Sequence, residues 1–277
     1  MLETTVDGLW VLQALTKIER TCPELGLRPL IPRLDTPEEA RRHPMAAELA
    51  AIGAVGADGV VDSMITEWLT VISRRDMALV VSINAPGREP TRVSISRFAT
   101  WWVVMERNDV MVRLYPAGAA SDEATASELV VGQIEQLCGV SAAAQLRPAT
   151  LDTARLLEGV RDGDSLRAFL FSQGLDSAQI QILSSAADRE RCAHADIVAV
   201  QAGLGPQEMG RLTVGDCAVS LIDTDQGRIC AENVVGGDGR RYQVLSPGTR
   251  SDIAGAVHRL IRGLPAGEQW YAHRRVV

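Results

Sequence analysis

Cysteine and histidine side chains offer the first candidate for chemistry in this chain. Cys192 and His194 are separated by one residue and could supply half of a metal site. A complete site needs further ligands at suitable spacing. The other three histidines, His43, His258 and His273, are scattered along the sequence and none has the spacing of a metal ligand. We therefore expect no metal ion at this position.

Two glycine-containing segments match ligand-binding loops only in part. Residues 223–227 begin like a calcium loop, but position twelve of that loop would be Val234 instead of a bidentate glutamate. Residues 203–206 contain glycines, yet Pro206 lacks the N–H group that a phosphate cradle requires. The chain also lacks the Gly-x-Ser-x-Gly motif of a nucleophile elbow. These motifs predict no catalytic residue and no cofactor, so we expect a protein that is not an enzyme.

The composition is typical of a globular protein with an acidic net charge. Of the 277 residues, 46% are hydrophobic and 23% are charged, which is enough apolar material for one large domain or two small ones. The net charge of −7 argues against binding to nucleic acid, which needs a basic surface. Lys17 is the only lysine, a bias that suggests a GC-rich genome and weakens any argument from the arginine content.

The absence of targeting signals and the use of cysteine indicate the compartment. No apolar run reaches the roughly 18 residues needed to cross a membrane. The N-terminus has no basic region followed by an apolar one, as a secretory signal would. The five cysteines are odd in number and scattered, as expected for reduced thiols that are mostly buried. We therefore expect a cytoplasmic protein without membrane insertion.

Residues 77–115 predict an antiparallel meander around which the other elements are arranged. Short runs of β-branched and aromatic residues alternate with tight turns in this stretch. Leu79 and Val81 share an apolar face and the other face is partly polar, so we expect a sheet covered on one side. The adjacent Trp101 and Trp102 must point to opposite faces. They form either an exposed aromatic platform or, as we favour, one core residue and one residue under a helix or at an interface.

Helix signals precede and follow this meander. Thr36 and Glu39 have the spacing of a capping box, with a proline at the first helical position between them. Asp7 predicts the start of an earlier helix. Residues 74–76, with the sequence Arg-Arg-Asp, are expected to form a solvated helix end. Residues 122–138 predict the helix that follows the meander, since a glycine comes directly after them.

The second half of the chain repeats the order of the first. A helical bundle is predicted over residues 153–187, followed by a second meander of four strands over residues 195–245. Ser251 then predicts the start of a helix over residues 252–262. In both halves a turn that contains proline and glycine leads into the last helix. This correspondence indicates a degenerate internal duplication.

We therefore predict an α+β fold made of two similar halves. The N-terminal half would span residues 1–140 and the C-terminal half residues 147–277. Each half alone would bury little surface, so we expect one compact unit in which a pseudo-twofold axis relates the halves. Their meanders would join in a central, mostly antiparallel sheet flanked by helical bundles.

Several short motifs follow one another along the whole chain. They are Val-Asp-Gly-Leu-Trp at residues 6–10, Pro-Glu-Leu-Gly-Leu-Arg-Pro at 23–29, Pro-Gly-Thr at 247–249, and Leu-Pro-Ala-Gly at 264–267 with Trp270 beyond. In this order they resemble the EspG proteins, the cytosolic chaperones of mycobacterial type VII (ESX) secretion. Residues 101–107 and 270–277 are most similar to the paralogue of the second ESX locus.

The resemblance implies a partner. EspG proteins bind the PPE subunit of a PE–PPE heterodimer at its helical tip, keep it soluble and help direct it to the secretion machine. In the family this tip is engaged by the sheet, by the loop between the early strands and by the C-terminal helical bundle. By position, the last two are similar to residues 85–90 and 166–187 here. The resemblance therefore implies these partner-binding residues: Arg88, Glu89, Arg92, Phe171, Gln173, Ser177 and Gln181.

Each of these residues also has a plain structural interpretation. An exposed Phe171 would be a hydrophobic anchor, but the residue could also belong to the core in a row with Leu175. Arg88, Glu89 and Arg92 would be charges at the rim of an interface that tune specificity more than affinity. Each of the three could instead be an ordinary solvated residue of a hairpin.

Two other functions stay open from the residues alone. A small-molecule enzyme or ligand-binding domain would use an open sheet face and would need a concave apolar pocket with convergent polar groups. A structural homo-oligomer would pair open sheet edges between copies. We expect the free protein to be a monomer or a weak homodimer.

Overall fold

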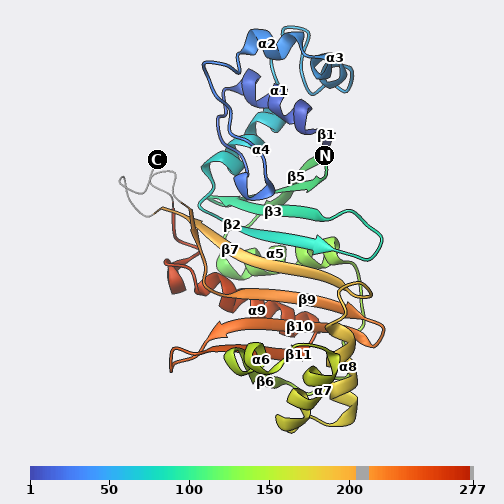
Figure 1. Ribbon diagram of the computed structural model, residues 1–277. Coiled ribbons are helices and arrows are strands. Elements are labelled where there is room, and N and C mark those ends of the chain that lie inside the picture. The colour runs from blue at the N-terminus through green and yellow to red at the C-terminus, as the bar shows by residue number, and fades with distance from the viewer. Residues whose placement is uncertain (204–211, 275–277) are drawn as a thin grey trace.

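A computed structural model describes residues 1–203 and 212–274 (Figure 1). The fold is α+β, with one large antiparallel sheet through the length of the molecule and helices on both of its faces. The strands in chain order are β1 (Leu2–Thr5), β2 (Met77–Asn84), β3 (Thr91–Phe98), β4 (Trp101–Asn108), β5 (Met111–Ala119), β6 (Ala149–Asp152), β7 (Ala193–Ala202), β8 (Leu212–Val214), β9 (Ala218–Thr224), β10 (Gly227–Val235) and β11 (Arg241–Pro247).

The two predicted meanders form one continuous sheet. Its order is β1-β5-β4-β3-β2-β7-β9-β10-β11-β6, and β8 pairs with β7 outside this path. The seam between the meanders is the antiparallel pair of β2 and β7, in which Val81 lies opposite Ile197. The prediction of a joined sheet is therefore confirmed. The strands β1, β6 and β8 were not predicted, because they are only three or four residues long and depend on a neighbouring strand for their pairing.

The helices agree with the predicted segments, with differences at their ends. They are α1 (Val6–Thr16), α2 (Pro37–Arg42), α3 (Pro44–Ala51), α4 (Ser63–Arg74), α5 (Glu123–Cys138), α6 (Thr153–Gly159), α7 (Gly163–Ser172), α8 (Ser177–Ala186) and α9 (Arg250–Arg262). Thr5 and Thr249 cap α1 and α9, so the predicted caps Asp7 and Ser251 are wrong and lie inside these helices. Among the described residues, no helix is long and apolar enough to cross a membrane.

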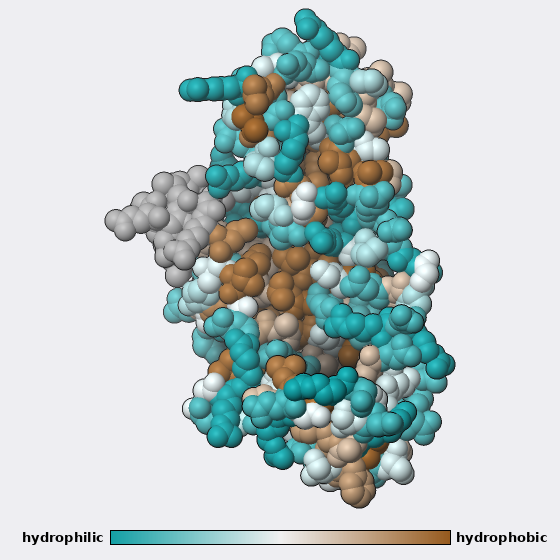
Figure 2. Space-filling model, in the orientation of Figure 1, coloured by the Kyte–Doolittle hydropathy of each residue, from teal (hydrophilic) through white to brown (hydrophobic). Residues whose placement is uncertain are grey.

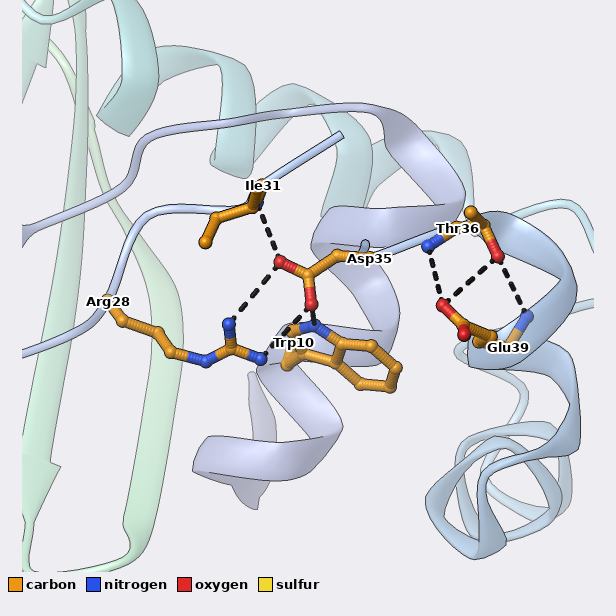
Figure 3. Close-up of polar contacts among 6 residues, drawn as sticks. All are labelled: Trp10, Arg28, Ile31, Asp35, Thr36 and Glu39. Atoms are coloured by element: carbon orange, nitrogen blue, oxygen red, sulfur yellow. Dashed lines mark hydrogen bonds and ion pairs between the residues drawn. The ribbon is translucent and has the colours of Figure 1, made fainter. Parts of the chain in front are cut away.

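A buried carboxylate ties together the N-terminal helices (Figure 3). Asp35 accepts hydrogen bonds from the indole Nε1 of Trp10 at 2.9 Å and from the backbone N–H of Ile31 at 2.6 Å, and it pairs with Arg28 at 3.2 Å. Burial alone would raise the pKa of Asp35, but these hydrogen bonds outweigh it and lower the pKa. The predicted capping box of Thr36, directly after Asp35 in the chain, is also confirmed.

One face of the sheet is covered by α5 and α9 (Figure 1). The shared core on this face contains Leu79, Ile197 and, from α9, Leu260. Trp102 is fully buried in the same core, whereas Trp101 is 58% exposed, as alternation along a strand requires. The prediction that the two tryptophans point to opposite faces is therefore confirmed.

The opposite face carries two separate groups of helices. The N-terminal helices pack on Val103 and Met105 of β4, and α7 and α8 belong to a core with Ile229 of β10 and Leu245 of β11. The expectation of a sheet covered on one side is therefore wrong. That expectation came from the partly polar pattern of β3, which suggested an exposed face. Ser94 and Ser96 are nevertheless fully buried, and their hydroxyls form a hydrogen bond of 3.0 Å with each other.

The segment 74–76 is another correction, since it is mostly a buried ionic connection instead of a solvated helix end. Arg75 is 4% exposed and donates hydrogen bonds to the backbone oxygens of Thr21 and Ile72 and to the carboxylate of Glu24. Asp76 is fully buried as well. Thr21 and Glu24 belong to a segment more than fifty residues earlier, and partners of this kind offset the cost of burying a charge.

Candidate partner-binding surface

The middle of the sheet presents an apolar strip between the two groups of helices. We define the central strip as Ala78 and Val80 of β2 with Val198 and Val200 of β7. These residues lie on the face opposite α5 and α9, because side chains alternate along each strand. Ala78, Val80 and Val200 are at most 8% exposed and Val198 is partly exposed, and the apolar cluster that they form contains no helix residue. Figure 2 shows apolar side chains gathered over this part of the face.

Polar side chains border the central strip on both sides. Ser220 of β9 donates a hydrogen bond of 2.5 Å to Asp196 of β7. On the β3 side, the Ser94 hydroxyl lies 3.3 Å from the carboxylate of Glu24. An apolar centre with a satisfied polar border is the usual composition of a protein–protein interface. The residues of this face therefore fit contact with a polypeptide.

The loop that contains Arg88 and Glu89 lies at one end of this face. Both side chains are exposed, and the loop follows Asn84, which pairs with His194 at the start of β7. Arg92 is exposed on β3 and, by alternation, lies on the same face as Ser94. No ion pair joins Arg88, Glu89 or Arg92 to another residue within 1–203 or 212–274. These charges are therefore available to a partner.

The helices α7 and α8 flank the same end of the sheet, and α8 borders an open groove. Ser177 and Gln181 line this groove of about 540 Å³ together with Asp225 and Gln226 of the β9–β10 turn. The Ser185 hydroxyl donates a hydrogen bond of 3.0 Å to Asp225 and so fixes α8 to that turn. The structure thus brings two of the predicted residues together in one concave site.

The other two predicted residues of this bundle lie outside the groove. Phe171 is 74% exposed on α7, so the core interpretation of this residue is wrong. Gln173 caps the end of α7 and donates a hydrogen bond of 3.1 Å to the hydroxyl of Ser172. Phe171 therefore offers a separate apolar contact point on the bundle, whereas Gln173 has a local structural role.

Sequence reasoning missed several residues that line this groove. They are Arg167, Ile180, Ser184, Ser185, Asp188, Arg191, Asp225 and Gln226. Helical spacing from Ser177 and Gln181 would have found Ile180, Ser184 and Ser185, because residues three and four apart share a helix face. No local signal identifies Asp225, since only the packing of the hairpin against α8 brings it there.

The candidate metal pair, Cys192 and His194, directly follows Arg191, a residue that lines this groove. The Cys192 thiol lies 3.2 Å from the backbone oxygen of Ser185, and burial raises its pKa. Burial and then the charge of Arg189 lower the pKa of His194. No group of three potential metal ligands occurs in the described part of the chain. The glycine segment 203–206 lies outside the described residues except for its first position.

Comparisons with known proteins agree with the resemblance seen in the sequence. The model of the EspG family matches residues 5–259. The chain is 64% identical over 277 residues, all of both chains, to the ESX-2 secretion-associated protein EspG2 of Mycobacterium tuberculosis. It is 28% identical over 235 residues, 82% of this chain and 74% of the relative, to the ESX-3 secretion-associated protein EspG3 of Mycolicibacterium smegmatis.

A solved structure shares the fold. It is the Mycobacterium tuberculosis type VII secretion system chaperone EspG5 in complex with the PE25–PPE41 dimer, with a TM-score of 0.75 and 21% identity. The match covers 96% of this chain and 98% of that one. Family model, relatives and shared fold extend over nearly the whole chain, and the chain therefore belongs to the EspG family.

Proposed function

We propose that this protein is a cytoplasmic chaperone that binds the PPE subunit of a cognate PE–PPE heterodimer. It would keep that subunit soluble and direct it to its type VII secretion system. The observation that carries the proposal is the central strip, an apolar cluster of β2 and β7 that contains no helix residue, in a member of the EspG family. The solved relative EspG5 was captured with a PE25–PPE41 dimer, which supports a partner of the same kind.

The physical advantage of such a complex follows from mass action. An apolar helical tip that is free in solution is an aggregation hazard, and a partner that covers it lowers the concentration of the free species. Recognition would place the tip on the central strip, next to the groove of α8. The groove of α8 is open and has a mostly polar lining, which fits a polypeptide better than the apolar pocket that a small molecule would need. No enzymatic step is part of this proposal.

Within this surface we assign roles to the residues named from the sequence. Phe171 would be an anchor that enters an apolar pocket of the partner. Ser177 and Gln181 would donate and accept hydrogen bonds in the groove of α8. Arg88, Glu89 and Arg92 would select among partners by their charge. The remaining candidate, Gln173, would act by ending α7 and thereby positioning Phe171.

The architecture would also follow from duplication, with halves at 1–140 and 147–277 in one compact unit. The strand order supports this, because β1 and β6 lie at the outer edges and each precedes a group of helices, a meander and a final helix. A pseudo-twofold axis would then pass through the seam of β2 and β7. We expect the free protein to be a monomer or a weak homodimer, since the short edge strands offer little pairing surface.

Co-expression tests the function. The chain would be produced with a PE–PPE pair from its own ESX locus and, in parallel, with a pair from another locus. Each sample would then be analysed by size exclusion with light scattering. A stable 1:1:1 complex with the cognate pair alone supports the proposal and its specificity. The proposal fails if no PE–PPE pair forms a complex with the folded chain.

A further inference from the structure

A groove with a strongly cationic lining lies at the other end of the central strip. We define the cationic groove by Lys17, Arg20, Arg74 and Arg75, which line a space of about 390 Å³. It forms where the ends of α1 and α4 approach Ala202, the last residue of β7. The loop 85–90 is at the opposite end of β2 and β7, so the two sites bracket the strip.

The charge of this groove contrasts with that of the whole chain. Lys17, Arg20 and Arg74 are exposed, and none of them forms an ion pair with a residue in the described ranges. Arg75 is buried, and Glu24 lies 2.9 Å from it. Glu19 is the only acidic residue in the lining that the structure describes. A protein with a net charge of −7 therefore concentrates unpaired positive charge at one site.

The ends of two helices explain the position of Lys17 and Arg74 in the groove, but not that of Arg20. Cations stabilise the negative end of a helix dipole, which accounts for Lys17 after α1 and Arg74 in the last turn of α4. Arg20 lies beyond the reach of that effect. Two buried polar atoms of the lining residues, Thr21 Oγ1 and Arg75 Nε, also have no hydrogen-bond partner among residues 1–203 and 212–274. Buried donors of this kind need a polar group to meet them.

The cationic groove is continuous with the central strip. Val198, Val200 and Ala202 occupy alternate positions of β7, so the strip extends along one strand into the groove. A polar chain provides a second connection, because Glu24 bonds to both Arg75 and Ser94. A polypeptide that lies along the strip would therefore reach the cations with its end.

We propose that the cationic groove receives acidic side chains of the polypeptide that covers the central strip, and so fixes the direction in which that polypeptide lies. This inference rests on the proposed function and adds the chemistry of the partner. Carboxylates match guanidinium groups in geometry and charge. The partner would carry aspartate or glutamate at the end that faces α1 and α4. The opposite end would face the loop 85–90 and α8.

The test compares two double charge reversals in complexes with a PE–PPE heterodimer that the wild-type chain binds. Arg20→Glu with Arg74→Glu changes the groove. Arg33→Glu with Arg42→Glu is the matched control, because both arginines are exposed outside the groove and have no ion pair with a described residue. Calorimetry at two salt concentrations should show at least about a tenfold loss of affinity for the groove variant and less than about twofold for the control.

Further results separate this inference from the proposed function. Arg20→Lys with Arg74→Lys keeps the charge and should retain most of the affinity and its salt dependence. The wild-type affinity should fall with added salt, and that of the groove variant should fall less steeply. If the groove variant binds like the wild type at both salt concentrations, the inference is wrong and the proposed function stands. If the wild type binds no PE–PPE pair, both are wrong.

Discussion

Arg97 and Asp76 form an ion pair in which neither side chain has any exposed surface, and their nearest charged atoms are 3.7 Å apart. The Arg97 guanidinium also donates hydrogen bonds to the backbone oxygens of Tyr271 at 3.0 Å and His273 at 2.8 Å. It lies against the rings of Trp270 and Tyr271. Burial lowers the pKa of Arg97 to about 10, so the side chain stays charged at neutral pH. One cation thus attaches the C-terminal segment to the sheet.

We expect Arg97→Ala to destabilise the protein by about 3–5 kcal/mol, because it removes the buried cation that pairs with the fully buried carboxylate of Asp76. Chemical denaturation monitored by tryptophan fluorescence would measure this loss. Arg113→Ala is the control, since Arg113 pairs with Glu3 at a site where both are well exposed. That variant should lose less than about 1 kcal/mol. Equal losses for the two variants would show that the buried pair has no special role.

Acidification should weaken the fold through His194 and His273. Burial is the main cause that lowers the pKa of both side chains, so the folded state prefers their neutral forms. The resulting contribution to stability is present above the ordinary histidine pKa and is lost as the pH falls through the lowered values. Thermal unfolding between pH 7.5 and 5 would show it. The double variant His194→Gln, His273→Gln should flatten this dependence, and an unchanged slope would exclude these residues as its source.

Asp35→Asn should destabilise the N-terminal helices by about 1–3 kcal/mol, because a neutral amide replaces an acceptor that serves Trp10, Ile31 and Arg28. The lowered pKa of Asp35 means that its contribution is present above the ordinary aspartate pKa and is lost as the pH falls through the lowered value. Hydrogen exchange of the residues in α1 and α2 would locate the effect. Uniform exchange across the whole chain would contradict a local role for Asp35.

Phe171→Ala should leave stability nearly unchanged and weaken partner binding by about 2 kcal/mol or more, since the ring is 74% exposed in the free protein. The measurement is the affinity for a cognate PE–PPE heterodimer. Leu157→Ala is the matched control, a similarly exposed apolar side chain at 68% on the neighbouring helix α6. If neither variant changes the affinity, these two exposed side chains of the bundle do not belong to the interface. If both variants weaken binding equally, Phe171 is not a specific anchor and the apolar contact includes Leu157 as well.

Exchanging the charges of the loop, with Arg88→Glu and Glu89→Arg, should change partner choice more than stability, because both side chains are exposed and without an ion pair among the described residues. The net charge stays the same, so a general electrostatic effect is avoided. Competition between PE–PPE pairs from two ESX loci would measure the change. Identical preferences before and after the exchange would show that this loop does not select the partner.

Local signals predicted most elements, and distant contacts explain the failures. The capping box of Thr36 depends on residues within one turn, so the sequence contains all the necessary information. The burial of Arg75 and Asp76 depends on partners such as Thr21 and Arg97, which only the folded chain brings close. No periodicity reveals such partners. Charged residues at a helix end therefore look solvated in a sequence even when they are buried.

The candidate partner-binding surface, like the secondary structure, could be predicted in part from the sequence. The resemblance to the family directed attention to Ser177 and Gln181, and both line the groove of α8. Asp225 faces them across that groove, but it belongs to a hairpin more than forty positions later, and the calcium-loop pattern around it drew attention to the wrong chemistry. The central strip had no sequence signal of its own, because a strand with helices on both faces and a strand with helices on one face can have the same apolar pattern.

The seam between β2 and β7 constrains how this chain is made. On the ribosome, β2 emerges more than a hundred residues before β7. Arg97 is synthesised 174 residues before Tyr271, whose backbone oxygen accepts its hydrogen bond. During synthesis the N-terminal half therefore exposes the unpaired edge of β2, a ready template for pairing with other chains. Completion of the sheet requires release of almost the entire polypeptide. A protein that would protect aggregation-prone clients thus passes through an aggregation-prone stage itself, and premature termination anywhere before β7 would leave that edge permanently open.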